Sequence, residues 1–417
     1  MNTLPGGEFT AYIGLDWANA KHDVCAANSD RRKSGKFQHT AGHIDQWAHE
    51  IHQRFGGVIA VALELSKGPI VYALQKYDFF VLFSINPFML AKYREAFQPS
   101  GAKCDRNDAA LALDLLVRHR DKLTPLRPQS APMRTLHCMV EQRRRLVGDV
   151  VRCTNRLGDA LKQYYPQALE WFAQRGSIVF CDFLVRWPTL SRVKLARKAT
   201  RETFFCEHNV RGTKCIEERI GAIKAAVPLT NDVAVIMAYQ LLAWAVVDQL
   251  RAALLAVERY DEGIAAIVPT LPDYALFSAL PGAGAQLAPR LLVAFGEQRE
   301  RFQSACEFKQ YCGVAPVFEG NGQQSWVHWR WQCPKFLRQT MVEWSAQTIT
   351  RSYWAGAYYR QQRDKGNTRQ AAVRALAFKW IRVLFRCWQT RTPHDESIYL
   401  NSLRVRGSPL VGATATG

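Results

Sequence analysis

Short apolar runs alternate with amphipathic stretches through the first 125 residues. Apolar or alternating runs predict strands, which lie at 12–17, 23–28, 36–40, 58–65 and 79–85. Stretches with apolar residues three or four positions apart predict helices, which lie at 44–55, 69–76, 88–97 and 108–118. Three neighbouring strands followed by alternating helix and strand are typical of an α/β domain with a mixed sheet, which we expect over residues 1–125.

The spacing of three and four then continues over much longer segments, at residues 136–164 and 247–268. Such heptad spacing predicts two long helices. The simplest interpretation is a long antiparallel coiled-coil arm over residues 126–271, with a helical insertion at its tip. Coiled-coil pairing between two chains is the alternative.

The pattern over residues 272–400 predicts a mainly α-helical domain. Residues 401–417 are interpreted as a tail, whose Gly/Ala/Thr-rich end we expect to be disordered. The helical domain opens with a Pro-Gly-Ala-Gly turn. Gly282 and Gly284 permit close approach of the backbone to a partner, and the next helix offers free N–H groups to a phosphate. A helix-hairpin-helix turn that grips a DNA backbone and a plain turn between helices both fit this motif.

The net charge of the chain indicates what kind of molecule it binds. The 417 residues include 55 Lys and Arg against 36 Asp and Glu, a net charge of +19, which predicts a polyanionic partner, either nucleic acid or a membrane surface. The most apolar run, residues 233–247, is shorter than the roughly 20 residues that cross a bilayer. The N-terminus has no signal-peptide pattern, and the 11 cysteines form no CxxC pair. We therefore expect a cytoplasmic protein with reduced thiols and no membrane partner.

The positive charge is concentrated near the C-terminus. Residues 1–125 carry 15 basic and 13 acidic side chains, whereas residues 301–417 carry 17 and 6. Seven of the 12 tryptophans lie between Trp326 and Trp388. Basic and aromatic residues together suit phosphate contact and base stacking. A tryptophan-rich core surrounded by solvated arginines is the alternative.

Four carboxylates are the candidates for chemistry. Asp16 and Glu64 each end an apolar strand, and Asp105 and Asp108 lie three residues apart at the start of a helix, on one face. A carboxylate set of this kind predicts a Mg²⁺ site for phosphodiester chemistry. Each residue also has a structural interpretation: Asp108 as a helix N-cap and Asp16 as a hydrogen-bond acceptor for a turn.

Several motifs resemble those of one known family. They are Tyr12-Ile13-Gly14-Leu15-Asp16-Trp17-Ala18, Ala62-Leu63-Glu64, Asp105-Arg106-Asn107-Asp108-Ala109, Leu280-Pro281-Gly282-Ala283-Gly284, Tyr311-Cys312-Gly313-Val314-Ala315-Pro316, Trp326-Val327-His328-Trp329-Arg330 and Phe336-Leu337-Arg338-Gln339. In order and spacing they resemble the DEDD transposases of bacterial insertion sequences. The resemblance covers nearly the whole chain.

The resemblance implies an RNase H-like N-terminal domain similar to RuvC, the Holliday-junction resolvase. It also implies metal-dependent DNA strand cleavage and exchange, with DNA (element ends and target) as substrate and an element-encoded bridge RNA as guide. Because a long arm separates the two halves of the site, we expect a homo-oligomer, a dimer or tetramer, in which subunits complete one another's sites.

One position departs from the family pattern. The family's serine nucleophile follows the Gly-Val-Ala-Pro stretch, and Asn321 stands at that place. An amide cannot form the covalent phosphoester link that a hydroxyl forms. Either Ser325 supplies the hydroxyl or strand cleavage is impaired. A RuvC-like junction nuclease that needs no serine, and a nucleic-acid-binding protein without catalysis, are the alternative functions.

Overall fold

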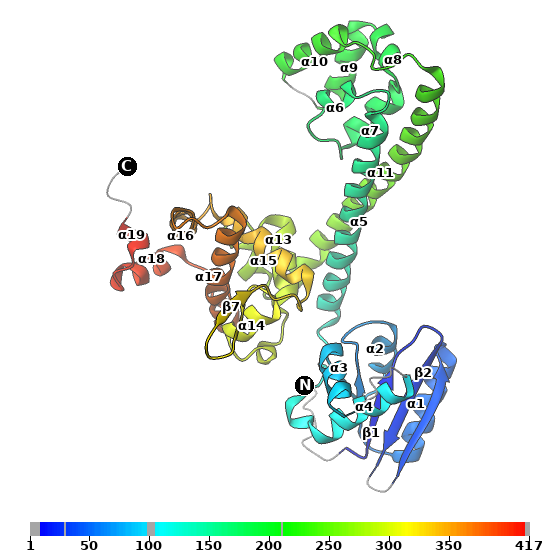
Figure 1. Ribbon diagram of the computed structural model, residues 1–417, viewed down its shortest axis with the longest axis vertical. Coiled ribbons are helices and arrows are strands. Elements are labelled where there is room, and N and C mark those ends of the chain that lie inside the picture. Colours follow the sequence, from blue (N-terminus) through cyan, green and yellow to red (C-terminus); the bar gives the residue numbers. More distant parts are fainter. Residues whose placement is uncertain (1–8, 29–30, 98–104, 210–211, 413–417) are drawn as a thin grey trace. The chain divides into compact units, whose positions relative to one another are not determined.

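The computed structural model describes residues 9–28, 31–97, 105–209 and 212–412, and it leaves the side chains of residues 105, 106, 411 and 412 undescribed. The predicted disordered end after Gly412 lies outside the described residues. The chain forms two compact units, Met1–Pro128 and Gln129–Gly417. Each unit is described by itself (Figure 1).

The first unit is built on a five-stranded sheet in the order β3-β2-β1-β4-β5. The strands are β1 (Ala11–Asp16), β2 (Lys21–Ala27), β3 (Arg32–Gln38), β4 (Ile59–Leu63) and β5 (Phe80–Ser84). Strands β1, β4 and β5 are parallel, whereas β2 pairs antiparallel with both β1 and β3. The predicted mixed sheet in an α/β unit is therefore confirmed.

Helices cover both faces of this sheet. The strand alternation sends Ile13 and Leu15 to one face, where they join a buried cluster with Ile44 and Trp47 of α1. Ala60 and Ala62 point to the other face, against a cluster that α3 and α4 complete. The helices of this unit are α1 (Ala41–Phe55), α2 (Pro69–Leu74), α3 (Pro87–Phe97), α4 (Asp105–Arg118) and the short η1 (Arg120–Lys122).

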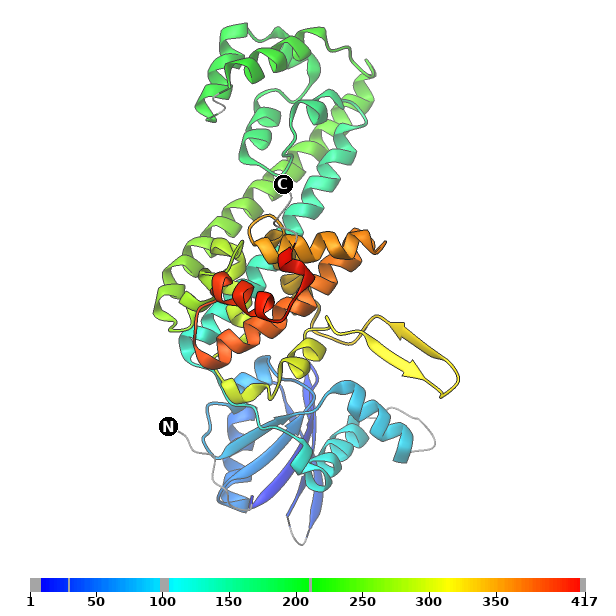
Figure 2. The ribbon, with the colours of Figure 1, turned by 90° about the vertical axis from the view of Figure 1, so that its left-hand side faces the viewer.

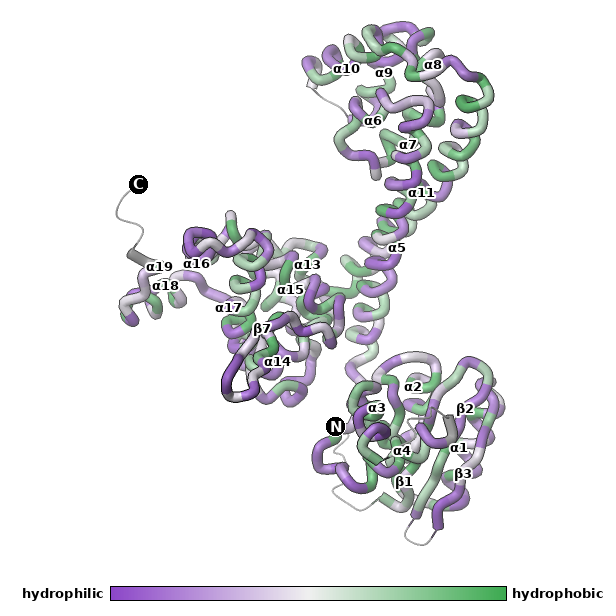
Figure 3. The backbone as a smooth tube through the Cα atoms, in the orientation of Figure 1, coloured by the Kyte–Doolittle hydropathy of each residue, from purple (hydrophilic) through white to green (hydrophobic). Residues whose placement is uncertain are grey.

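The third strand begins earlier than predicted. β3 spans Arg32–Gln38 rather than 36–40, and six of its seven side chains are exposed or only half-buried. Figure 3 shows this outer strand as largely hydrophilic. An edge strand is held mainly by its backbone ladder with β2, so its polar side chains carry little strand signal.

The second unit contains two long helices, α5 (Ala131–Leu161) and α11 (Val233–Ile267). They run antiparallel, because Arg143 binds Asp261 at 2.5 and 2.9 Å whereas Arg156 donates to Gln249 at 3.2 Å. The helices between them are α6 (Gln167–Trp171), α7 (Ile178–Arg186), α8 (Leu190–Leu195), α9 (Lys198–Glu207) and α10 (Thr213–Ala225). Heptad packing of a coiled coil along this pair stays a prediction.

In the part of the chain that the structure describes, one helical segment, Val233–Thr270, is apolar and long enough to cross a membrane, by length and composition only. Within the unit this segment is tied to its neighbours by polar contacts. Besides the two contacts with α5, Arg251 forms an ion pair with Asp182 of α7. These contacts are those of a helix packed within a folded unit.

The remainder of the second unit is mainly helical, as predicted. Its elements are η2 (Val268–Thr270), α12 (Tyr274–Ser278), α13 (Gly284–Phe295), η3 (Arg299–Arg301), α14 (Ala305–Tyr311), β6 (Val317–Gly320), β7 (Ser325–His328), α15 (Lys335–Thr348), α16 (Tyr353–Asp364), α17 (Arg369–Thr390), α18 (Glu396–Val405) and α19 (Pro409–Gly412). Two features were not expected. Strands β6 and β7 form a hairpin, and α18 continues past residue 401, where we placed the start of the tail.

Candidate functional site: a carboxylate edge and a hairpin

Asp16 and Glu64 lie next to each other at one edge of the sheet. Asp16 is the last residue of β1, and Glu64 directly follows β4. The two strands are parallel, with Leu15 opposite Leu63, so the next position on each strand brings the two acids to the same level. Both are half-buried. Alternation places them on the face that α4 covers.

Gly14 brings helix α4 against this face. A Cβ atom built on Gly14 would lie 2.0 Å from the carbonyl oxygen of Ala109 and 2.5 Å from the amide nitrogen of Leu113. Only glycine allows the helix to approach the strand so closely. The sequence Gly14-Leu15-Asp16 therefore fixes both the strand end and the position of the helix above it.

Helix α4 runs antiparallel to β1. Its C-terminal end lies at the start of β1, because the Arg120 guanidinium, just past the helix, lies 4.4 Å from the ring of Phe9. The N-terminal end of α4, which carries Asp105 and Asp108, is therefore at the edge where Asp16 ends its strand. Asp105 opens the helix, and its side chain lies outside the described residues.

Asp108 is engaged by an arginine. Its side chain is almost completely buried, and Arg94 of α3 donates to its Oδ1 at 2.9 Å from Nε and 2.5 Å from Nη2. A buried carboxylate of this kind needs such a partner, because an unpaired charge away from water is costly. The N-cap interpretation of Asp108 does not hold, since α4 already begins at Asp105.

A fifth carboxylate, Asp23, joins the same edge. It lies opposite Asp16 in the β1–β2 ladder and is only 3% exposed, with its Oδ1 3.1 Å from Lys36 Nζ. Sequence reasoning missed it because Asp23 was taken as the start of a strand. The signal was available: after a tight turn at 18–20, an acid at the start of β2 falls opposite the acid that ends β1.

The donor chemistry of this edge fits a hard divalent cation, since carboxylate oxygens are the ligands that Mg²⁺ prefers. The arrangement itself is not that of a closed metal site. Among the described residues, no group of three or more His, Cys, Asp or Glu side chains is placed to hold a metal ion. Asp108 is paired with Arg94, and the Asp105 side chain is not described. A metal would have to compete with Arg94 for Asp108.

A hairpin in the second unit carries the other predicted site residue. Ser325 begins β7, is exposed, and pairs with Gly320 of β6. Asn321 has a structural task in the turn, because its Oδ1 accepts hydrogen bonds from the backbone nitrogens of Gln323 at 3.2 Å and Gln324 at 2.9 Å. Among the described residues 317–328 of this hairpin, Ser325 has the one side-chain hydroxyl, and its role as nucleophile stays a prediction.

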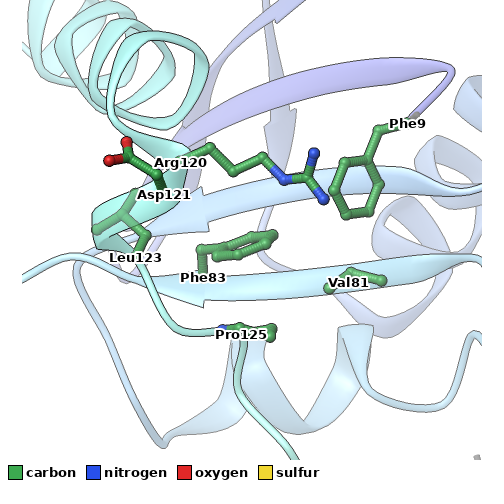
Figure 4. A pocket seen from close by; sticks show the side chains of 7 residues that line it. All are labelled: Phe9, Val81, Phe83, Arg120, Asp121, Leu123 and Pro125. Carbon is green, nitrogen blue, oxygen red and sulfur yellow. The ribbon is translucent and has the colours of Figure 1, made fainter. Parts of the chain in front are cut away.

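A pocket of the first unit lies elsewhere. It has a volume of about 440 Å³ and is lined by Phe9, Val81, Phe83, Arg120, Asp121, Leu123 and Pro125 (Figure 4). Arg120 and Phe9 place it near the C-terminal end of α4, opposite the end that carries Asp105 and Asp108. Its lining is mostly apolar. It is not part of the carboxylate edge.

Regions of both units match known families of proteins. Residues 13–166 match a family model described as a transposase, of the DEDD type found in IS110 elements, and residues 274–360 match one described as transposase IS116/IS110/IS902 family. The matched regions contain the carboxylate edge and the hairpin, respectively.

Two similar proteins agree with this assignment. The chain is 28% identical over 403 residues to the mini-circle transposase described for IS117 of Streptomyces coelicolor, which covers 93% of this chain and 96% of that protein. It is 31% identical over 209 residues to a transposase, y4uE, of Sinorhizobium fredii, covering 48% of this chain and 57% of that protein. With both domains matched in order, the chain belongs to the IS110 family of insertion-element transposases.

Proposed function

We propose that this transposase cuts and rejoins DNA strands at the ends of its element and at a target, with Asp16, Glu64, Asp105 and Asp108 as the residues that hold Mg²⁺. The observation that carries the proposal is the meeting of two strand ends and one helix start at a single edge, which the close contact at Gly14 enforces. Such an edge combines hard oxygen ligands with a half-exposed position that a phosphate can reach.

When bound, a divalent cation would neutralise the charge of the scissile phosphate and favour attack and departure of its oxygens. The chain's own residues position the carboxylates. Asp16 ends β1 and Glu64 directly follows β4, so the sheet places both acids at the same level. Arg94 orients the buried Asp108 carboxylate through two hydrogen bonds to its Oδ1. Lys36 forms an ion pair with the buried Asp23 at 3.1 Å.

The proposal assigns the nucleophile to Ser325. Attack by its Oγ on the scissile phosphorus forms a P–Oγ bond and breaks the bond from phosphorus to one strand end. That strand end leaves as a hydroxyl after taking up a proton, and the serine loses its own. The Asn321 amide cannot take this role, and it is already occupied in the turn.

A supercoiled-plasmid assay with the element's ends tests the carboxylates. Recombination products should form with Mg²⁺ and disappear in Asp16→Ala, whereas Asp114→Asn should keep them. Asp114 is the matched control because it lies on α4 but pairs with Arg32 outside the carboxylate edge, at 3.0 Å. Full activity of Asp16→Ala would overturn the assignment.

A covalent protein–DNA adduct, detected on a denaturing gel, tests the nucleophile. The adduct should form with the unmodified chain and vanish in Ser325→Ala, while Ser304→Ala, an N-cap serine in the same unit, should keep it. An adduct that persists in Ser325→Ala contradicts the assignment.

A second function, hydrolytic cleavage of DNA junctions, is favoured by one observation: Asn321 stands where the family pattern has its serine. This function predicts nicked products, no adduct in any variant, and no effect of Ser325→Ala.

Guidance by a bridge RNA, assembly into a dimer or tetramer, and a cytoplasmic location belong to the same proposal. They are supported by the family membership and by the basic C-terminal third, which carries 17 basic against 6 acidic residues from 301 to 417. Guidance predicts that recombination requires the element's own transcript and that exchanging the transcript's pairing segment redirects the target.

A further inference from the structure

Six of the seven C-terminal tryptophans divide into two sets with opposite environments, and the seventh, Trp329, is half-buried. Trp344, Trp354, Trp380 and Trp388 are fully buried and form the core of the helical region. Trp326 is 48% exposed and Trp331 is 75% exposed. The sequence alternatives of a core and a contact surface therefore both apply, each to a different set.

The exposed set belongs to the β6–β7 hairpin and the segment that follows it. Phe318 of β6 is 73% exposed and lies opposite Val327, whereas Trp326 lies opposite Glu319. Alternation therefore puts Phe318 and Trp326 on opposite faces of a two-stranded ribbon. Figure 2 shows the hairpin extending away from the helices of its unit. Among the described residues, neither of these rings stacks on another ring.

The surroundings of the hairpin are cationic. From residue 311 to 340 the chain has three basic residues, Arg330, Lys335 and Arg338, and one acidic residue, Glu319. Glu319 is already bound, since its carboxylate accepts from Trp326 Nε1 at 3.2 Å and pairs with His328 Nε2 at 2.8 Å. This pairing raises the pKa of His328, and a protonated His328 balances the charge of Glu319, so the excess positive charge is that of Arg330, Lys335 and Arg338.

The base of the hairpin contacts two helices of its unit, α15 and α17. The ring of Trp329 lies between two guanidinium groups, 4.6 Å from that of Arg338 and 4.7 Å from that of Arg374 of α17. These cation–π contacts anchor the ribbon to the helices. The exposed rings of Phe318 and Trp326 therefore stand on a two-stranded ribbon whose base is packed against α15 and α17.

We propose that the β6–β7 hairpin binds unpaired DNA, with bases stacked on Phe318 and Trp326 and phosphates beside the cations at its base. Exposed aromatic rings next to positive charge are what single-stranded nucleic acid requires, because an unpaired base offers its face and its phosphate offers charge. Bases inside a duplex are already stacked and cannot use the rings. The inference rests on the proposed function, in which strand exchange exposes unpaired DNA.

Binding in the absence of Mg²⁺ tests this inference apart from cleavage. The probes are a fluorescein-labelled 30-nucleotide DNA strand of mixed sequence and the corresponding duplex, with EDTA, measured by anisotropy on the full chain. Phe318→Ala and Trp326→Ala should each weaken single-strand binding about 5- to 100-fold, the range expected for loss of one stacked base. Duplex binding should change less than about 2-fold.

Two kinds of control variant separate stacking from general damage. Ile398→Ala removes a side chain that is 67% exposed on α18 and should leave both affinities unchanged. Phe318→Trp and Trp326→Phe keep a ring and should restore most of the single-strand affinity. Thermal unfolding should match that of the unmodified chain for every variant, because these side chains are exposed.

Other outcomes overturn the inference. Equal losses on single strand and duplex would mean that the rings do not stack on bases, and an effect confined to an RNA strand of the same sequence would mean that DNA is not the occupant. A change from oligomer to monomer in Phe318→Ala by light scattering, with unchanged DNA affinity, would assign the hairpin to contact between chains. A chain that binds through the rings but never cleaves DNA contradicts only the proposed function.

Discussion

The carboxylate edge and the β6–β7 hairpin are built in opposite ways. At the edge, the functional side chains stand on buried strands and a buried helix, and two of the acids are held by Arg94 and Lys36. On the hairpin, the side chains of interest are exposed on a ribbon with no core of its own. The carboxylate edge is therefore held in place by the sheet and helix beneath it, whereas the hairpin exposes its side chains to solvent.

The difference indicates a division of labour. Charged groups that act on a phosphate must be held in a fixed geometry, and a sheet edge supplies it. Rings that stack on flexible DNA need access more than they need exact placement, and a projecting ribbon supplies access. The excess of positive charge follows the second region, whereas the first is nearly neutral.

The largest expected effect is on catalysis at the edge. Glu64→Gln keeps the size of the side chain and removes its charge, so strand cleavage should fall by about 10²–10³-fold. Single-strand DNA affinity should be unchanged, because the hairpin is intact. Gel quantification of cleavage and anisotropy on the same preparation measure both quantities. A parallel loss of affinity would mean that the two regions are not independent.

The second prediction concerns glycines in the two regions. Gly14→Ala should destabilise the first unit by about 3 kcal/mol, because the new Cβ meets backbone atoms of α4. In Gly322→Ala, in the hairpin turn, the new Cβ meets no atom within 4 Å, and the change is disfavoured only by the positive φ of +87°. It should lower the free energy of unfolding by about 1 kcal/mol. Native-state hydrogen exchange resolved by peptide measures each region separately. Similar costs at the two sites would contradict the contrast.

The third prediction concerns the ion pair that holds Asp108. Arg94→Ala leaves a buried carboxylate without its partner, which should lower the stability of the α3–α4 region by about 3 kcal/mol, because Arg94 itself keeps some contact with solvent. Lys92→Ala is the control, since its pair with Glu95 on the same helix is exposed. Hydrogen exchange of the α4 amides makes the comparison. Equal protection in the two variants would show that Arg94 does not support Asp108.

The smallest expected effect is a pH dependence beside the edge. His22 is buried next to His39, and burial followed by the neighbouring imidazole lowers the pKa of His22 to about 4. In the unfolded chain the imidazole of His22 has its ordinary pKa of 6.5, so as the pH falls it takes up a proton before the folded chain does. The contribution of His22 to stability is therefore full above pH 6.5 and declines toward pH 4. At pH 5 the loss should be about 2 kcal/mol.

Exchange of the β1–β2 amides at pH 7 and pH 5 measures this decline. His22→Gln should reduce it, because a neutral amide replaces the titrating group, whereas the exposed His49→Gln should not. A wild-type chain whose β1–β2 protection is the same at both pH values would contradict the pKa direction.

The sequence predicted the elements of the first unit well, because buried parallel strands read as continuous apolar runs. It also located Asp16 and Glu64, since an acid that directly follows such a run must lie at a strand end. The contact at Gly14 could not be predicted, because the distance from a strand to a helix is a tertiary property. The Arg94–Asp108 pair, between different helices, was missed for the same reason.

The hairpin was harder to predict. Val317–Gly320 and Ser325–His328 are only four residues each, and most of their side chains face solvent, so no buried face imposes an alternation. Composition alone could not separate the two sets of tryptophans either. Their separation depends on helix packing, which buries Trp380 between Trp344 and Trp354 but leaves Trp331 in solvent.

Iron-directed backbone cleavage tests the central claim, that the edge binds a divalent cation, most directly. Fe²⁺ replaces Mg²⁺, and with ascorbate and peroxide it cuts the chain beside its site, where mass spectrometry locates the breaks. The account predicts breaks near Asp16, Glu64 and the start of α4, suppressed by excess Mg²⁺ and by Asp16→Asn but not by Asp114→Asn. Breaks confined to other segments, or the same breaks in Asp16→Asn, would contradict it.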